Sequence, residues 1–164
     1  MAGLEAETHA CAGKEHANAL LDLVKAFERI PHLYVVHYAR RLGYNLRLLR
    51  LSLAAYRLPR RVGIGGIYSR AIQATRGITA GSTFATTELR VLLLDVVVTL
   101  QKRWSGVLTI KLYVDDLSLS ASGLPSRIAK LMAAVLDFVT DKLERGLGLE
   151  VSAKKSVVLA GRPC

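Results

Sequence analysis

Two adjacent acidic residues between two apolar strands constrain the fold of this chain more than any other feature. Residues 107–120 read VLTIKLYVDDLSLS, so Asp115 and Asp116 separate two short runs with strand-like alternation. A hairpin turn at this point would lift both carboxylates to one end of a sheet. Neighbouring like charges repel each other, and a bound cation relieves that repulsion. A simple Asp-Asp turn is the alternative, because Asp favours turns.

A third acidic residue stands in a comparable setting near the start of the chain. Residues 19–27 read ALLDLVKAF, in which Asp22 follows an apolar strand. An acid in such a position costs stability unless it is solvated, paired or bound to metal. A solvated strand end, or a pairing with Lys25, explains this segment as well as a metal does. Mg²⁺ is the metal that best suits such carboxylates, because it takes oxygen ligands together with substrate phosphates.

The remaining elements predict an α+β fold with an antiparallel sheet and helices packed on one face. The pattern predicts helices over residues 32–56, 82–103 and 125–145, a hairpin over 59–75 around Gly65-Gly66, and short strands at 149–151 and 157–160. Residues 1–18 are Ala-rich and polar with no clear period, and they are interpreted as a poorly defined N-terminal segment before a domain over 19–164.

Composition narrows the class of protein. The chain has 164 residues, of which 51% are hydrophobic, and this is enough for one domain with a core. Its formal net charge of +10 attracts polyanions, so a nucleic-acid partner and a merely solvated basic face both remain open. No apolar run reaches the roughly 20 residues of a membrane span, and the N-terminus does not resemble a signal peptide. Two cysteines near opposite ends are no disulfide framework, so an intracellular setting is expected, in nucleus or cytoplasm.

The two acidic segments together resemble motifs A and C of reverse transcriptases, especially those of non-LTR retroelements and group II introns. Motif A is an Asp followed after three residues by Ala-Phe, here Asp22 and Ala26-Phe27. Motif C is an aromatic residue, a small residue and two Asp, here the run Tyr113 to Asp116. The 93 positions from Asp22 to Asp115 suit the family.

Two further segments in the expected order strengthen the resemblance. Residues 76–82, RGITAGS, are similar to motif B, although Thr79 and Ala80 stand where the family has Pro and Gln. Gly148-Leu149 and the run 152–156, SAKKS, are similar to motif D, with Ser152 in place of Asn and Lys155 matching the motif's lysine.

The resemblance implies a polymerase palm with a two-metal site. Asp22, Asp115 and Asp116 would bind two Mg²⁺ ions, which Mn²⁺ could replace, and Lys155 would help to protonate the leaving pyrophosphate. Phe27 would act as the steric gate that selects dNTP over rNTP. The full set of residues implied to contact substrate is Leu23, Val24, Phe27, Arg76, Gly77, Gly81 and Tyr113.

The implied function is RNA-directed DNA synthesis on an RNA or DNA template with a primer, from dNTP and with no membrane involved. A catalytically impaired palm that only binds nucleic acid through its basic face is the alternative. A nuclease or cyclase on a related fold agrees less well with motifs B and D. Only 21 residues precede Asp22 and the sequence stops at Cys164, so fingers and thumb segments are expected to be missing. Palm surfaces left uncovered in this way are expected to self-associate.

Overall fold

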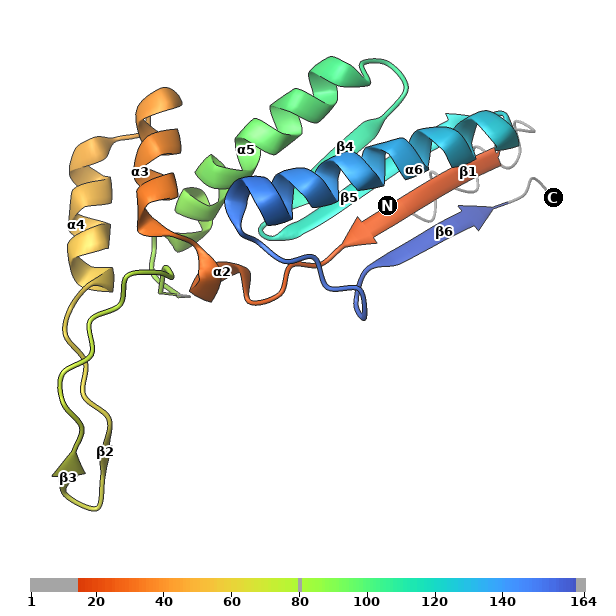
Figure 1. The fold of residues 1–164 in the computed structure, drawn as a ribbon. Helices are drawn as coiled ribbons and strands as arrows, with labels where there is room; N and C mark the ends of the chain where they lie inside the picture. The colour runs from red at the N-terminus through yellow and green to blue at the C-terminus, as the bar shows by residue number, and fades with distance from the viewer. Residues whose placement is uncertain (1–14, 80, 162–164) are drawn as a thin grey trace. The chain divides into compact units, whose positions relative to one another are not determined.

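The computed structural model describes residues 15–79 and 81–161, which fall into two compact units (Figure 1). The first unit takes in Met1–Val24 and Leu94–Cys164, and the second spans Lys25–Leu93. The long helix α5 (Ala85–Arg103) runs across the boundary between these two stretches of chain. Each unit is described by itself below.

The first unit is built on a four-stranded antiparallel sheet. Its order is β4 (Thr109–Tyr113), β5 (Asp116–Gly123), β1 (Glu15–Leu21) and β6 (Val157–Gly161). Alternate residues of the two central strands are buried, as expected where one face of a sheet lies in the core. These buried residues are Ala17, Ala19 and Leu21 of β1 and Leu117, Leu119 and Ala121 of β5.

Helix α6 (Pro125–Asp141) packs along this buried face, against β1 and β5 (Figure 1). Its buried side chains recur every three or four residues, which is the spacing of one helix face. They are Ile128, Met132, Val135 and Val139, and the π-helical turn η1 (Lys142–Gly146) continues the row with Leu143. Trp104 meets Phe138 of α6 edge to face, with 5.4 Å between ring centroids. The predicted α+β class, an antiparallel sheet with helices, is therefore confirmed.

In the second unit, the helix predicted over residues 32–56 is in fact two helices. After the short α2 (Ala26–Arg29), α3 covers His32–Arg41 and α4 covers Leu46–Tyr56. The break falls at Gly43, whose φ of 70° is a conformation that glycine adopts readily. Asn45 then caps α4 by accepting hydrogen bonds from two backbone N–H groups of its first turn.

The predicted hairpin is present as β2 (Gly63–Ile64) and β3 (Ile67–Tyr68). Gly65 and Gly66 join the strands with φ of 58° and 83°, as a type I′ turn requires. The segment at 149–151 forms only a single bridge, between Leu23 and Val151.

Strand β1 begins at Glu15, four residues before the predicted strand, because residues 15–18 pair with β5. The rest of the predicted N-terminal segment, residues 1–14, lies outside the described residues. Within residues 15–79 and 81–161, no helix has both the length and the hydropathy that crossing a membrane requires.

Candidate active site

The turn between β4 and β5 presents two carboxylates at one end of the sheet. Tyr113 pairs with Asp116, which leaves Val114 and Asp115 as a two-residue loop. Val114 has a φ of 57°, although a β-branched side chain disfavours the left-handed region. Such a conformation costs about 1–3 kcal/mol and persists only where the surrounding structure enforces it. The strained turn keeps Asp115 and Asp116 half-buried at the tip of the hairpin.

Strand pairing brings Asp22 to the same end of the sheet. In the antiparallel register of β1 and β5, Leu20 lies opposite Ser118 and Leu21 lies opposite Leu117. One further step of that register puts Asp22 opposite Asp116. Acidic residues that are more than ninety positions apart in the chain are therefore brought to neighbouring strand ends.

The loop after the η1 turn holds the backbone of Asp22 on both sides. The amide of Ser152 donates to the Asp22 carbonyl oxygen at 2.8 Å. The amide of Asp22 donates to Ser156 Oγ at 3.2 Å. From the same loop, Lys155 Nζ lies 3.6 Å from Asp22 Oδ2. The segment that resembles motif D thus places its lysine beside the acid of motif A.

The donor atoms at this sheet end suit a divalent cation. Asp22 Oδ2 is buried and has no hydrogen-bond partner among the described residues. Its ion pair with Lys155, at 3.6 Å, is longer than the roughly 2.7–2.9 Å of a charge-assisted hydrogen bond. Carboxylate oxygens with free lone pairs are the ligands that Mg²⁺ takes. Over the described part of the chain, however, no three or more His, Cys, Asp or Glu side chains are arranged as a ready-made metal cage.

Two further predicted residues, Leu23 and Val24, follow Asp22 directly. Leu23 is buried and bridges to Val151. The amide of Val24 donates to the Glu150 carbonyl oxygen at 2.9 Å. The Val24 N–H is therefore already engaged within the sheet unit. Tyr113, at the end of β4, is exposed and available for contacts.

In the second unit, the segment that resembles motif B is tied to the helix that carries Phe27. The amide of Gly77 donates to the Ile30 carbonyl oxygen, and that of Ile78 to the Phe27 carbonyl oxygen, both at 2.8 Å. Gly77 has a φ of 86°, and a Cβ atom there would lie 2.8 Å from the Glu28 carbonyl oxygen. Only glycine satisfies both constraints without strain.

A pocket of about 280 Å³ lies beside this segment. Its polar lining includes Arg60 and Arg76 together with Glu28 and Tyr56. The predicted residue Arg76 is exposed, as is Gly81, whereas Phe27 is half-buried. Phe27, Arg76, Gly77 and Gly81 thus belong to one unit, and Asp22, Asp115, Asp116 and Lys155 belong to the other.

Glu88 is a buried acid that the sequence reasoning did not identify. Its side chain is fully buried in α5, and Tyr56 Oη donates to its Oε2 at 2.8 Å. The same hydroxyl lies 3.3 Å from Ser82 Oγ, just after Gly81. Burial raises the pKa of the Tyr56 hydroxyl above its ordinary value, and Glu88 adds to the rise. The sequence offers one signal for this residue. Glu88 is the first acidic residue after Glu28, at the end of a long stretch that contains no other acidic residue.

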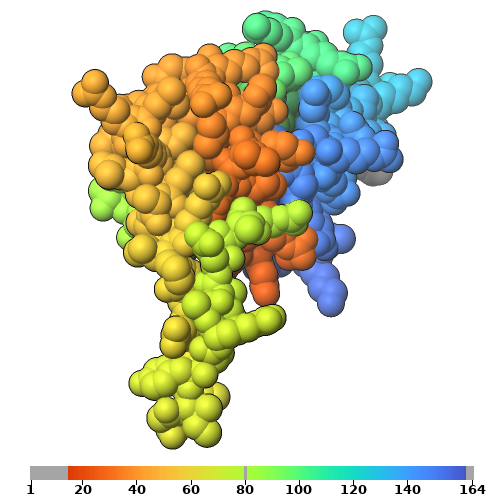
Figure 2. All heavy atoms as spheres, turned by 60° about the vertical axis from the view of Figure 1, so that its left-hand side comes forward, coloured from red at the N-terminus to blue at the C-terminus, as the bar shows by residue number. Residues whose placement is uncertain are grey.

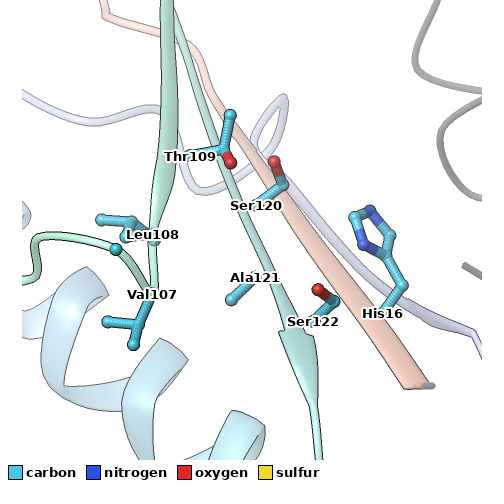
Figure 3. Close-up of a pocket in the computed structure, with 8 residues that line it drawn as sticks. His16, Val107, Leu108, Thr109, Ser120, Ala121 and Ser122 are labelled. Carbon is cyan, nitrogen blue, oxygen red and sulfur yellow. The ribbon is translucent and has the colours of Figure 1, made fainter.

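A polar cavity of the sheet unit lies away from these carboxylates. It measures about 420 Å³ and is lined by the ring of His16 and the hydroxyl groups of Thr109, Ser120 and Ser122 (Figure 3). Thr109 pairs with Ser120 at the end of the β4–β5 ladder remote from Tyr113 and Asp116. None of the predicted site residues lines it.

Comparison with solved structures finds the same fold in telomerase. Telomerase from Candida albicans, bound to a fragment of telomeric RNA, matches with a TM-score of 0.67 and 14% identity over 96% of this chain. Telomerase from Candida tropicalis matches with TM-scores of 0.66 in its complex with that RNA fragment and 0.63 in its apo form, each at 12% identity, over 98% and 90% of this chain.

The chain spans less than a third of each of these telomerases, between 29% and 31% of their length. Models of known protein families give no match, and neither do the curated proteins. At such low identity the likeness concerns the fold alone. The chain therefore has a reverse-transcriptase-like α+β fold of the kind found in telomerase.

Proposed function

We propose that this chain is the palm of an RNA-directed DNA polymerase, related to the reverse transcriptases of non-LTR retroelements and group II introns. Its reaction would join a dNTP to a primer 3′-hydroxyl on an RNA or DNA template. The observation that carries the proposal is the register of β1 and β5, which, extended by one residue, aligns Asp22 with Asp116 beside the Val114-Asp115 turn. The telomerase-like fold supports the same class of chemistry.

Asp22, Asp115 and Asp116 would hold two Mg²⁺ ions, or Mn²⁺ in their place. When bound, such a metal pair lowers the pKa of an attacking hydroxyl and neutralises charge on the phosphate oxygens. The three carboxylates would hold the positive charge of these ions at the strand ends. Until a cation binds, the Lys155 ammonium group, 3.6 Å away, partly neutralises Asp22.

Lys155 would then act as the proton donor to the leaving pyrophosphate. Its side chain is 74% exposed, so it can turn from Asp22 towards a bound triphosphate. The backbone of Leu23 and Val24 would lie along that triphosphate, although the Val24 amide is already bonded to Glu150. Tyr113 is exposed at the sheet end and would meet the primer terminus.

The second unit would supply the remaining substrate contacts. Phe27 would exclude a 2′-hydroxyl by steric clash under the sugar. Arg76 is exposed in a pocket with Arg60, where a phosphate or a template base can be bound. Gly77 and Gly81 would let the backbone approach a nucleotide closely.

A catalytically impaired palm that only binds nucleic acid is the second candidate. It is favoured by Thr79 and Ala80, which replace the Pro and Gln of the family motif. On either reading, we expect the chain by itself to extend a primer weakly or not at all.

Metal binding tests the site directly. We expect Asp115→Asn to weaken Mn²⁺ binding about tenfold or more, measured by calorimetry or electron paramagnetic resonance, with an unchanged circular dichroism spectrum. The matched control is Asp137→Asn, which removes an exposed carboxylate from α6. Equal Mn²⁺ affinity for Asp115→Asn and the unaltered chain would exclude the two-metal proposal.

Primer extension on poly(rA)/oligo(dT) then separates a polymerase from a binder. Extension that is lost in Asp115→Asn supports the polymerase. Metal binding without any extension is expected on either reading, so it is the presence of extension that distinguishes the polymerase.

A further inference from the structure

The net charge of the chain is confined to one stretch of the second unit. Residues 29–87 contain ten arginines and no acidic residue, whereas the other residues hold thirteen basic and thirteen acidic side chains. The two acids that flank this stretch, Glu28 and Glu88, include one that is fully buried. The exposed surface of this unit therefore carries an almost unopposed positive charge, which attracts polyanions.

The β2–β3 hairpin projects from this unit beyond helices α3 and α4 as a narrow tongue (Figure 2). Residues 57–76, which form the hairpin and its stems, contain five of the ten arginines. Two of these five already have polar partners. Arg57 Nε donates to His32 Nδ1 at 3.1 Å, and Arg60 lies 3.4 Å from Thr79 Oγ1. Arg76 lies in the pocket described above, whereas Arg61 and Arg70 are exposed on the hairpin itself and can reach a ligand there.

The tip of the hairpin is apolar and almost entirely bare. Ile64 and Ile67 are 80% and 79% exposed, and Tyr68 is 69% exposed. An exposed apolar patch of this kind marks a binding surface. Tyr68 is also held in place, because its ring lies over Gly63, where an added Cβ would come within 2.7 Å of it. A fixed, exposed aromatic ring is what a base needs for stacking.

Charge decides which occupant fits this surface. A second copy of the chain would bring arginines against arginines, so self-association through the hairpin is opposed by repulsion. A nucleic acid satisfies both features at once, since phosphates pair with arginine and bases stack on an aromatic side chain. A two-stranded β-ribbon is also narrow enough to enter a nucleic-acid groove.

We propose that the β2–β3 hairpin is a nucleic-acid-binding arm, in which Arg61 and Arg70 contact phosphates while Tyr68 and the isoleucines at the tip contact bases. This inference deepens the proposed function by naming a binding surface for its nucleic-acid partner. It does not depend on the metal site, because the carboxylates Asp22, Asp115 and Asp116 belong to the other unit.

The test is fluorescence anisotropy in EDTA, over a series of salt concentrations, with three probes: a single-stranded RNA, duplex DNA and an RNA–DNA hybrid. We expect the double variant Arg61→Ala, Arg70→Ala to bind more weakly and to lower the slope of log affinity against log salt by about 1.4–1.8, because each phosphate contact contributes about 0.7–0.9. The matched control is Arg127→Ala with Lys130→Ala, which removes the same charge from exposed positions of α6 in the other unit.

Tyr68→Ser examines the tip separately. We expect roughly tenfold weaker binding with an unchanged salt slope, because stacking does not release counterions. The probe that loses most affinity identifies the strand type that the tip contacts. The fold should persist, since Tyr68 is mostly exposed, and circular dichroism checks this.

Three results would contradict the proposal that the hairpin binds nucleic acid. They are no binding to any probe, equal losses of affinity in the hairpin and α6 variants, or dimers in sedimentation that Tyr68→Ser dissociates. Failure here is distinguishable from failure of the proposed function. Asp115→Asn is expected to lose Mn²⁺ while keeping nucleic-acid affinity in EDTA, and the hairpin variants are expected to do the reverse.

Discussion

The sheet unit and the unit spanning Lys25–Leu93 use charge in opposite ways. The sheet unit has eleven basic and eleven acidic residues, and three of its acids lie in segments at one end of the sheet. The other unit has twelve basic residues and two acidic ones, of which Glu88 is buried. The sheet unit has equal numbers of basic and acidic residues and carries acidic residues at one sheet end. The unit spanning Lys25–Leu93 carries an excess of positive charge over its surface.

The difference in charge suits the two units to different kinds of ligand. A point of negative charge suits a small divalent cation, and a broad positive surface suits the extended backbone of a polyanion. The two units are also stabilised differently. Strand pairing and the packing of α6 stabilise the sheet that carries the acidic residues. In the unit spanning Lys25–Leu93, backbone hydrogen bonds join α2 to the Gly77 segment.

The largest expected effect tests whether the two units unfold separately. Leu119 is fully buried in β5, and Leu119→Ala should lower the free energy of unfolding by about 3 kcal/mol. Trp104, the single tryptophan, lies against Phe138 in the sheet unit and reports its unfolding by fluorescence in urea. The equivalent Leu49→Ala in the second unit should leave the Trp104 transition in place. Equal shifts of that transition would show that the two units unfold as one.

The next effect concerns the backbone approach at Gly77. Gly77→Ala adds both a positive-φ penalty and a clash with Glu28, so we expect a loss of about 2 kcal/mol in the free energy of unfolding. Gly43→Ala has a similar φ and nothing within 4 Å, so it should cost about 1 kcal/mol. Urea titration followed by circular dichroism compares the two. Equal losses would mean that the contact with α2 contributes nothing.

A smaller loss of stability is expected when the buried acid Glu88 loses its hydrogen-bond donor. Tyr56→Phe leaves Glu88 Oε2 without its donor, which should cost about 1–2 kcal/mol. Burial raises the pKa of Tyr56 in the folded state. The stability that the protonated hydroxyl contributes is therefore fully present below the unfolded pKa of 10.0. It is lost as the pH rises from that value through the folded pKa.

Urea titrations between pH 8 and 11 measure this dependence. Tyr56→Phe should show a shallower decline than the unaltered chain, while Tyr68→Phe, at an exposed position, should decline as the unaltered chain does. Identical slopes for all three proteins would show that Tyr56 is not the source of the decline in stability with pH.

The smallest expected effect concerns the turn that carries Asp115. Val114→Gly relieves a strained φ of 57° but loosens the unfolded chain, so we expect a net gain of about 0.5 kcal/mol. The same change at Val158, within β6, should destabilise the protein instead. Thermal unfolding distinguishes the two signs. A loss of stability in Val114→Gly would show that the valine side chain contributes more than its backbone costs.

Sequence patterns predicted the elements that local interactions determine. The hairpin at Gly65-Gly66, helix α6 and the strands around Asp115-Asp116 all follow from spacing and turn chemistry. The break at Gly43 was missed, because the apolar spacing continues on both sides of it and conceals the end of α3. The start of β1 at Glu15 was missed as well, because short, weakly apolar residues such as Ala17 join the strand only through pairing with β5.

By itself, the sequence determined the strand–turn–strand around Asp115-Asp116, the order of the four motif-like segments and the excess of positive charge. These depend on neighbours within a few positions, or on composition alone. Only the tertiary structure decided that the β1–β5 register leads Asp22 to the strand end of Asp116, that Lys155 lies beside Asp22, and that Glu88 is buried against Tyr56. Each of those pairs closes a loop of more than thirty residues, so it depends on strand register and core packing, which no local pattern specifies.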